Sequence, residues 1–204
     1  EQGCLMQGFE YPAEPHVRRH GPAGYADYGS YRDWLRDEFI FRCVYCLHRE
    51  QWYGRPGTFD IEHFVPVSVD PLGKCEYTNL LYACRTCNAA KTNVLAVPDP
   101  CSVAFGDCLR IERDGEVAPL NADGKKLRDV LCLNSPFNVS YRSRWMRTLE
   151  TLRDCDPQLF EEFMGFPENL PDLRRKHEPA NTKPDGVEDC YFALRERGEL
   201  PTTY

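Results

Sequence analysis

Two pairs of cysteines constrain this chain more than any other feature of its sequence. Cys43 and Cys46 form one Cys-x-x-Cys pair, and Cys84 and Cys87 form a second pair that starts 38 positions after Cys46. Two such pairs are the usual way to build a tetrahedral zinc site from four thiolates. A zinc ion held in this way would join the two ends of the segment between the pairs. We therefore predict a structural Zn²⁺ bound by these four cysteines.

Eleven cysteines in 204 residues also allow a second interpretation, a secreted scaffold held together by disulfides. Such scaffolds are usually shorter and have an even number of cysteines, whereas intracellular proteins keep their thiols reduced and use some for metal. No signal peptide or apolar run long enough for a membrane span is visible, so we expect a cytoplasmic protein. Most of the other seven cysteines are expected to be buried or half-buried free thiols, namely Cys4, Cys75, Cys101, Cys108, Cys132, Cys155 and Cys190.

The net charge of −7 is unevenly distributed. Residues 41–94 carry six basic and five acidic side chains, whereas residues 1–40 carry four and seven, and residues 95–204 carry fifteen and twenty. The acidity therefore lies outside the segment with the cysteine pairs. No segment is the strong basic patch expected of a protein that holds DNA tightly by itself.

Hydrophobic periodicity and turn residues predict an α+β fold. Helices are expected over residues 28–41, 84–93, 121–131, 141–152, 157–164 and 187–197. A short strand is expected over residues 58–61, with a turn before it at 54–57 and extended chain after it at 65–69. Asp114-Gly115 lies between two apolar segments and predicts a hairpin. Residues 1–24 have the composition of an extended arm.

The segment between and including the cysteine pairs carries a recognisable set of motifs. It contains Asp60-Ile61-Glu62-His63-Phe64-Val65-Pro66, then Asn79-Leu80-Leu81, then Cys84-Arg85-Thr86-Cys87-Asn88-Ala89-Ala90-Lys91. This combination closely resembles the motif of the HNH (ββα-metal) endonucleases over roughly residues 41–93. Three strings also resemble the HNH partners of bacterial anti-phage systems such as the Septu type: Cys-x-Tyr-Cys, Glu-His-Phe-x-Pro and Cys-x-x-Cys-Asn-x-x-Lys.

The resemblance implies a role for each matched residue. His63 would be the general base, Glu62 and Asn88 would bind a catalytic Mg²⁺ or Mn²⁺, and Asn79 would hold the loop and orient His63. Asn88 stands where many members of the family have the final His. Asp60 would tune His63 or the metal, and Lys91 would either contact phosphate or cap its helix.

The chemistry of phosphodiester hydrolysis fits these residue types. A neutral His can take a proton from water, and a hard cation can stabilise charge on the phosphoryl and leaving oxygens. The resemblance implies hydrolysis of DNA, with duplex DNA as the first expectation, RNA or single strands as alternatives, and 5′-phosphate ends on the products. With the predicted elements on either side of the motif, we expect three parts: an N-terminal arm and helix at 1–40, an HNH core with its zinc at 41–94, and a C-terminal hairpin and helical region at 95–204 packed on the core.

A rival hypothesis is a zinc-binding module that contacts nucleic acid or protein without catalysis. Intact Glu62, His63 and Asn88 argue against it. The acidic net charge leads us to expect a protein partner that recruits or activates the chain, as in an antiviral defence system.

For several other residues the sequence allows two structural or functional roles. Tyr141, Trp145 and Tyr191 could anchor a partner or pack in the core. Arg142, Arg144, Arg147 and Arg153 could form a phosphate-contacting face or a solvated helix face. His48 is expected beside the zinc or at the surface, and His16, His20 and His177 are expected at the surface.

Overall fold

The computed structural model describes residues 8–53, 57–176 and 186–204. Its strands are β1 (Asp60–His63), β2 (Leu80–Ala83), β3 (Leu109–Ile111) and β4 (Val117–Pro119). Its α-helices are α1 (Arg32–Glu38), α2 (Arg85–Lys91), α3 (Ala122–Val130), α4 (Pro136–Cys155), α5 (Pro157–Met164) and α6 (Tyr191–Glu196). Short 3₁₀ turns lie at Tyr28–Tyr31, Glu50–Tyr53, Leu72–Cys75, Tyr77–Asn79, Phe105–Asp107, Leu173–Arg175 and Val187–Asp189.

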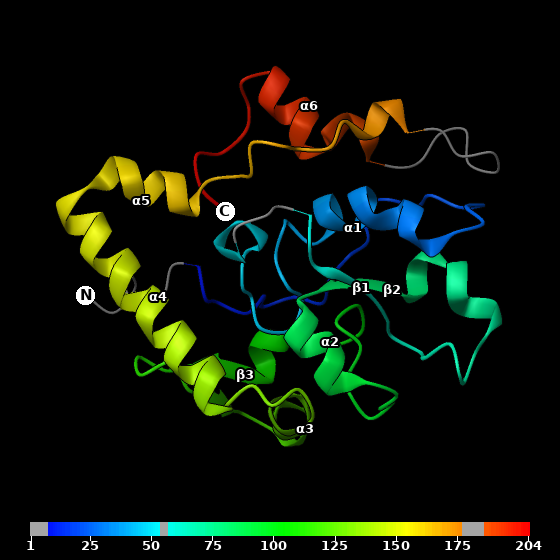
Figure 1. Ribbon diagram of the computed structural model, residues 1–204, viewed down its shortest axis with the longest axis horizontal. Helices are drawn as coiled ribbons and strands as arrows, with labels where there is room; N and C mark the ends of the chain where they lie inside the picture. Colours follow the sequence, from blue (N-terminus) through cyan, green and yellow to red (C-terminus); the bar gives the residue numbers. More distant parts are fainter. Residues whose placement is uncertain (1–7, 54–56, 177–185) are drawn as a thin grey trace.

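The centre of the structure is the hairpin of β1 and β2 with α2 directly after it (Figure 1). The two strands are antiparallel, and their register pairs Asp60 with Ala83 and His63 with Leu80. α2 contacts β1, whereas α1 contacts β2, and all four residues of β2 are buried. Cys84 caps the start of α2, because its sulfur accepts a hydrogen bond from the Cys87 amide at 3.5 Å. The predicted ββα arrangement is thus present.

A second hairpin and three helices surround this centre. β3 and β4 pair in antiparallel fashion around Gly115, whose φ of 89° suits glycine. Asn121 caps α3 by accepting from the Gly124 amide, and Ser135 caps α4 in the same way from Asn138. α4 has 20 residues and runs along one side of the molecule from α3 towards α5 (Figure 1). The predicted hairpin and the helices of this region are confirmed, and so is the α+β class.

The prediction of extended chain at residues 65–69 is wrong. This segment turns back on itself, since the amides of Val69 and Asp70 both donate to the carbonyl of Pro66. β2 has only four residues, so no strand is available to pair with a longer β1. The strand predicted at residues 58–61 lies at 60–63 in the structure, because its bounds are set by pairing with the four residues of β2. The predicted turn at 54–57 lies largely outside the described residues.

The arm at residues 8–25 contains no helix or strand, as predicted, but it packs more closely than expected. His20 is only 3% exposed, and its Nε2 lies 2.9 Å from Oδ1 of Asp37. His16 is half-buried and lies 2.9 Å from Oε1 of Glu38. The surface prediction is therefore wrong for His20, because buried carboxylates at the end of α1 need polar partners and the arm supplies them. His177 lies outside the described residues.

Among the helices that the structure describes, none combines the length and apolar character that crossing a bilayer requires.

Candidate metal centre and active site

The four motif cysteines converge on one point. The sulfurs of Cys43, Cys46, Cys84 and Cys87 all lie within 4.8 Å of one another and are buried. Cys46 Sγ and Cys84 Sγ are 3.7 Å apart, far more than the roughly 2.05 Å of a disulfide. Four sulfurs placed about 2.3 Å from a tetrahedral zinc ion would be separated by about 3.8 Å. The geometry therefore fits the predicted zinc, and the described residues hold no other such cluster.

The protonation of the thiols also fits a metal centre. Burial opposes ionisation, yet contacts from the thiols of Cys46, Cys84 and Cys87 hold the pKa of Cys43 well below its ordinary value. Burial and its sulfur neighbours raise the pKa of Cys46. Contacts from the neighbouring thiols, together with burial, likewise raise the pKa of Cys87, so ionisation of Cys43 opposes ionisation of Cys46 and Cys87. A divalent cation would remove this conflict, since metal binding deprotonates its cysteine ligands.

His63, at the end of β1, is positioned by two contacts. Its Nε2 lies 2.9 Å from the carbonyl oxygen of Lys74, and its ring meets Tyr28 edge-to-face with centroids 4.9 Å apart. A carbonyl oxygen only accepts, so the hydrogen of the neutral imidazole resides on Nε2. This leaves Nδ1 with a free lone pair. The side chain is partly exposed, so that lone pair can reach a water molecule.

Asn79 braces the loop that follows His63. Its Oδ1 accepts from the Val65 amide at 2.8 Å, and its Nδ2 donates to the carbonyls of Val65 and Gly73 at 3.0 and 3.2 Å. Its own carbonyl accepts from the Phe64 amide. These contacts hold the backbone on the C-terminal side of His63 and connect it to the turn before Lys74. The hydrogen bonds of the Asn79 side chain thus go to the loop that follows His63 and to Gly73, and not to the imidazole.

Glu62 lies inside the protein. It is 2% exposed; Lys91 Nζ lies 2.5 Å from its Oε1, and the Tyr45 hydroxyl donates to its Oε2 at 2.9 Å. Lys91 is itself fully buried and also donates to the carbonyls of His63 and Phe64. The ammonium of Lys91 therefore joins α2 to the end of β1, and neither of its predicted roles, phosphate contact or helix capping, describes these contacts.

This pairing gives a prediction for stability. Replacing Glu62 with alanine would leave the buried ammonium of Lys91 without its counter-ion, which typically costs about 3–5 kcal/mol. We expect Glu62→Ala to lower the free energy of unfolding in urea by an amount of this order, and Glu62→Gln, which keeps hydrogen-bonding atoms for Lys91 and Tyr45, to lower it much less. Equal stability of Glu62→Ala and wild type would show that the ion pair does not form.

Asp60 is the carboxylate that meets Asn88. Asn88 Nδ2 donates to Asp60 Oδ2 at 3.1 Å, and both side chains are partly exposed. They line an open pocket of about 420 Å³ together with Tyr28, Arg32, Ile61, Arg85 and Ala89. Side chains alternate between the two faces of a strand, so Asp60 and Glu62 both face α2. Their i, i+2 spacing was the signal in the sequence that Asp60 belongs with this site.

Of the remaining candidates, Arg142 and Trp145 pack into the protein, whereas the other arginines of α4 do not. Arg142 is buried and donates to the carbonyls of Gly115 and Leu133 at 2.7 and 2.6 Å, so it cannot contact phosphate; Arg144 and Arg147 are exposed. Trp145 stacks on Trp52 with centroids 4.5 Å apart.

Three further aromatic candidates also make internal contacts. Tyr141 contacts His48, and Tyr191 packs against Phe41 and Phe166. His48 lies beside the cysteine cluster, where burial lowers its pKa to about 3 and keeps it neutral. Core packing thus accounts for each of these residues.

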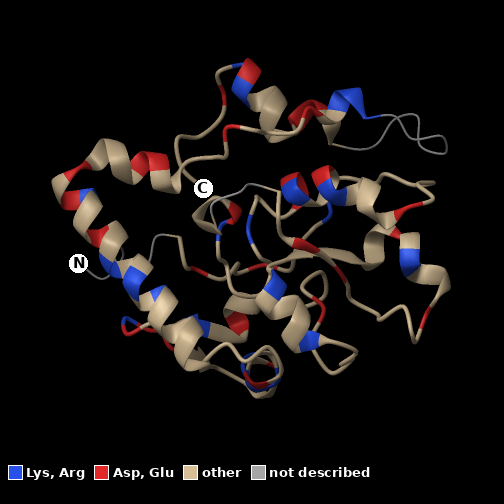
Figure 2. Ribbon diagram, in the orientation of Figure 1, with Lys and Arg blue, Asp and Glu red and all other residues tan. Residues whose placement is uncertain are grey.

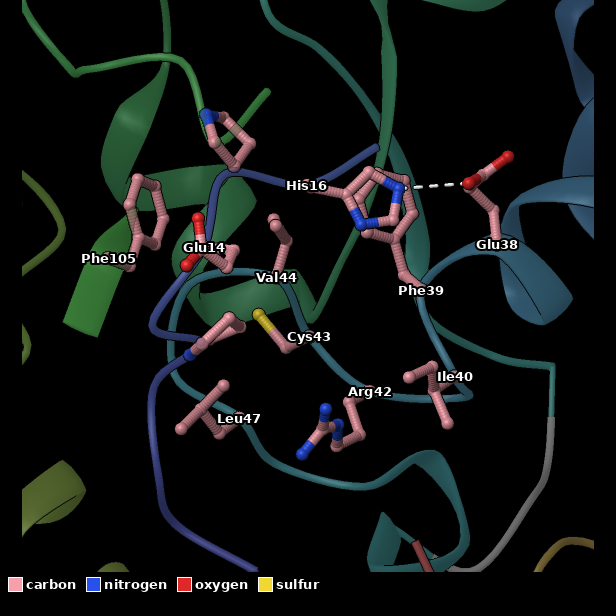
Figure 3. Close-up of a pocket in the computed structure, with 12 residues that line it drawn as sticks. Glu14, His16, Glu38, Phe39, Ile40, Arg42, Cys43, Val44, Leu47 and Phe105 are labelled. Atoms are coloured by element: carbon pink, nitrogen blue, oxygen red, sulfur yellow. Dashed lines mark hydrogen bonds and ion pairs between the residues drawn. The ribbon is translucent and has the colours of Figure 1, made fainter. Parts of the chain in front are cut away.

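A second hollow, behind Cys43, is distinct from the Asp60–Asn88 pocket. It holds about 90 Å³ and is lined mainly by apolar side chains, together with Glu14, His16, Glu38 and Arg42 (Figure 3). His16 stacks on Phe39 and is hydrogen-bonded to Glu38 at its edge. None of its lining residues belongs to β1 or α2, and Cys43 is the one motif residue among them.

Basic residues are spread over several of the described elements and are not confined to one of them (Figure 2). Lys and Arg are interspersed with Asp and Glu over the ribbon, with several along α4 (Figure 2). Around the Asp60–Asn88 pocket the cations are Arg32 and Arg85, and Lys74 lies over the Tyr28 ring that contacts His63. The local positive charge therefore consists of these few side chains.

The comparisons with known proteins agree with this geometry. The family model of the HNH endonucleases matches residues 43–94, which include both cysteine pairs, β1, β2 and α2. No curated protein matches the chain. Residues 43–94, about a quarter of the chain, are thus similar in sequence to an HNH endonuclease domain, and they carry a ββα arrangement beside four converging cysteines.

Proposed function

We propose that this chain is a metal-dependent nuclease that hydrolyses phosphodiester bonds of DNA. The observation that carries the proposal is the placement of His63. It lies at the end of β1 with Nε2 held by a backbone carbonyl and with Nδ1 free, on the hairpin that the cysteine cluster joins to α2. An imidazole fixed in one tautomer is what general-base catalysis requires.

His63 would act as the general base in this reaction. Nδ1 would take a proton from water as the oxygen of that water attacks phosphorus and the bond from phosphorus to the 3′ oxygen breaks. The departing 3′ oxygen takes a proton from solvent, and the contact of Nε2–H with Lys74 O stabilises the imidazolium that forms. Asn79 keeps the loop after His63 in place, and Tyr28 limits rotation of the ring. Arg85, exposed at the pocket, is available to contact the phosphate.

Two metals fit the residues present. The four cysteines would hold a structural Zn²⁺, which stabilises the fold directly. Asn88 and a carboxylate of β1 would hold Mg²⁺ or Mn²⁺, since these cations prefer oxygen ligands and keep several waters. The motif position nominates Glu62 for the carboxylate. Such a cation supplies charge stabilisation for the phosphoryl and leaving oxygens.

The test is a substrate panel incubated with the purified, zinc-loaded chain and Mg²⁺ or Mn²⁺. We expect nicking and linearisation of supercoiled plasmid, and less cleavage of single-stranded DNA and RNA of the same sequence. Nicks that DNA ligase reseals directly would show 5′-phosphate and 3′-hydroxyl ends. Cleavage of RNA alone would replace DNA with RNA as the substrate.

We further propose that a protein partner brings this chain to DNA, as in an effector subunit of an antiviral defence system. The support is electrostatic: the net charge is −7, and few cations surround the pocket. Affinity for DNA comes largely from basic side chains that displace counterions from phosphates, so a chain with few of them binds weakly alone. The anti-phage resemblance of the motif strings points in the same direction.

This proposal predicts a steep loss of activity with salt. The isolated chain should cleave plasmid at low ionic strength and only slowly at about 150 mM salt, because its few phosphate contacts are then largely screened. The measurement is the initial nicking rate across a salt series at fixed Mg²⁺. Rapid, complete digestion by the chain alone at physiological salt would show that no partner is required.

A further inference from the structure

We infer that one face of α4 binds an unpaired strand of the DNA substrate, outside the HNH segment. This inference rests on the proposed nuclease function and deepens it, because it adds a second contact with the substrate. The face consists of exposed or partly covered residues spaced three or four positions apart, which places them on one side of the helix. We call it the outer face of α4, and its residues are Phe137, Ser140, Arg144, Arg147 and Thr151.

The outer face of α4 carries positive charge that has no partner within the described residues. None of its residues is acidic, and the acidic residues of α4 lie only in the last two turns of the helix. The side chains of Arg144 and Arg147 make no hydrogen bond or ion pair in the described part of the chain. Other exposed arginines, such as Arg110 and Arg197, pair with carboxylates. Two unpaired guanidinium groups on one helix face attract phosphates, whose geometry they match.

Phe137 adds an accessible aromatic ring to this face. It is the second residue of α4 and is 64% exposed. Its ring stacks on Tyr141, with centroids 6.1 Å apart and 26° between the planes. Tyr141 in turn contacts Tyr53 and Trp145, with centroids 5.5 and 6.3 Å away. These rings support Phe137 from below and leave most of its surface open, so that a nucleobase can stack on it.

Ring contacts connect this face to the HNH segment. The Tyr53 ring, which contacts Tyr141, also meets the Phe59 ring edge-to-face with centroids 5.4 Å apart. Phe59 directly precedes Asp60, which begins β1 and lines the open pocket of about 420 Å³. The row of rings that starts at Phe137 therefore ends beside the first residue of the catalytic hairpin. DNA held at the HNH segment then has α4 as a neighbouring surface.

The combination of ring and arginines favours an unpaired strand over a duplex. From Phe137 to Arg147 the helix rises about 15 Å, at about 1.5 Å per residue. A base inside a duplex is stacked on both sides, so its face is open to Phe137 only where the strand is unpaired. Arg144 and Arg147 would contact phosphates of the same strand. Cations beside a stacking aromatic ring are what proteins use to bind single strands without sequence preference.

The experiment measures binding with two fluorescein-labelled probes, a blunt duplex and the same duplex with a single-stranded tail of about ten nucleotides. Fluorescence anisotropy is recorded with zinc-loaded protein in the absence of Mg²⁺, across a salt series. We expect wild type to bind the tailed probe more tightly than the blunt one. Phe137→Leu should bind the tailed probe at least about fivefold more weakly and the blunt probe equally well. The double variant Arg144→Ala and Arg147→Ala should lower the slope of log affinity against log salt on the tailed probe by about 1.4.

Two matched controls separate these effects from general changes in the protein. Phe137→Tyr keeps the aromatic ring, and the double variant Arg175→Ala and Arg197→Ala removes the same two charges from exposed positions outside α4. Both controls should retain the preference for the tailed probe, and the double control should retain the wild-type salt slope. Thermal unfolding and zinc content verify that every variant folds.

Three results would overturn the inference. These are equal or undetectable binding of the two probes by wild type, wild-type affinity of Phe137→Leu for the tailed probe, and the same loss of slope in both double arginine variants. Failure of the proposed nuclease function looks different, because it would appear as absence of plasmid nicking with Mg²⁺ or Mn²⁺ by a wild type that still prefers the tailed probe.

Discussion

Replacing Cys84 with serine is expected to remove zinc from the protein and to disrupt its fold. Cys84 contributes one of four converging sulfurs. Its sulfur also accepts a hydrogen bond from the Cys87 amide and so caps the start of α2. Structural zinc sites supply folding free energy directly, about 10–16 kcal/mol of apparent binding energy in small zinc-binding peptides. We expect the variant to contain little zinc and to unfold more than about 10 °C below the wild type.

The matched control is Cys155→Ser. Cys155 lies at the end of α4, is exposed, and takes no part in the cluster. It should leave both zinc content and unfolding temperature unchanged, which would separate loss of a metal ligand from loss of a thiol. Metal analysis of the wild type should give one zinc per chain. Protein purified without zinc, with Cys84→Ser as stable as Cys155→Ser, would refute the zinc site.

Replacing His63 with alanine is expected to abolish detectable cleavage while the protein stays folded. The imidazole is partly exposed and makes two side-chain contacts, with Lys74 O and the Tyr28 ring, so its loss should cost little stability. Its catalytic contribution is that of a general base, typically about 10²–10⁴-fold in rate. Rates of plasmid nicking at saturating Mg²⁺ would measure the difference.

Added imidazole offers a second readout for His63→Ala. The substitution opens space beside Tyr28, and a free imidazole that enters it can take the proton that His63 no longer accepts. Partial recovery of nicking with rising imidazole, and none for wild type, would identify the missing group as a base. Wild-type rates in His63→Ala, at unchanged zinc content, would assign the proton transfer to another residue.

The zinc cluster could be predicted from the sequence because its determinants are local. A Cys-x-x-Cys pair presents two sulfurs to one ion whatever surrounds it, so two pairs suffice to predict the site. The helix after Cys84 and the helix that begins at Asn121 are local in the same sense, since the start of each depends on residues within one turn. These features appear in the structure close to where the sequence places them.

The contacts of the acidic residues could not be predicted in this way. Whether Asn88 meets Asp60 or Glu62 depends on how α2 lies against β1, and this follows from packing between elements. Lys91 is one turn after Asn88, so the same placement that pairs Asn88 with Asp60 pairs Lys91 with Glu62. Neither pair is visible as a pattern in the chain, because a strand–helix pairing has no fixed sequence spacing.

Two buried polar residues outside the motif, His20 and Arg142, also differ from expectation, because their burial depends on contacts between elements that are distant in the sequence. His20 is covered because the arm lies against the end of α1, where it hydrogen-bonds to Asp37. Arg142 is covered because its guanidinium satisfies the carbonyls of Gly115 and Leu133, at the hairpin turn and beyond α3. Charged side chains are mostly exposed, and sequence alone does not show which of them will find buried partners.

Metal-dependent cleavage with His63 as general base is tested most directly by the rate of plasmid nicking. The rate is measured for zinc-loaded wild type and His63→Ala, prepared in parallel, with and without Mg²⁺. Zinc content is measured in every sample, so that the structural and catalytic metals are distinguished. We expect nicking by the wild type that requires added Mg²⁺ or Mn²⁺ at constant zinc content, and none by His63→Ala. No nicking by the wild type with either cation at low salt, or equal nicking by both proteins, would contradict it and favour a zinc-binding module without catalysis.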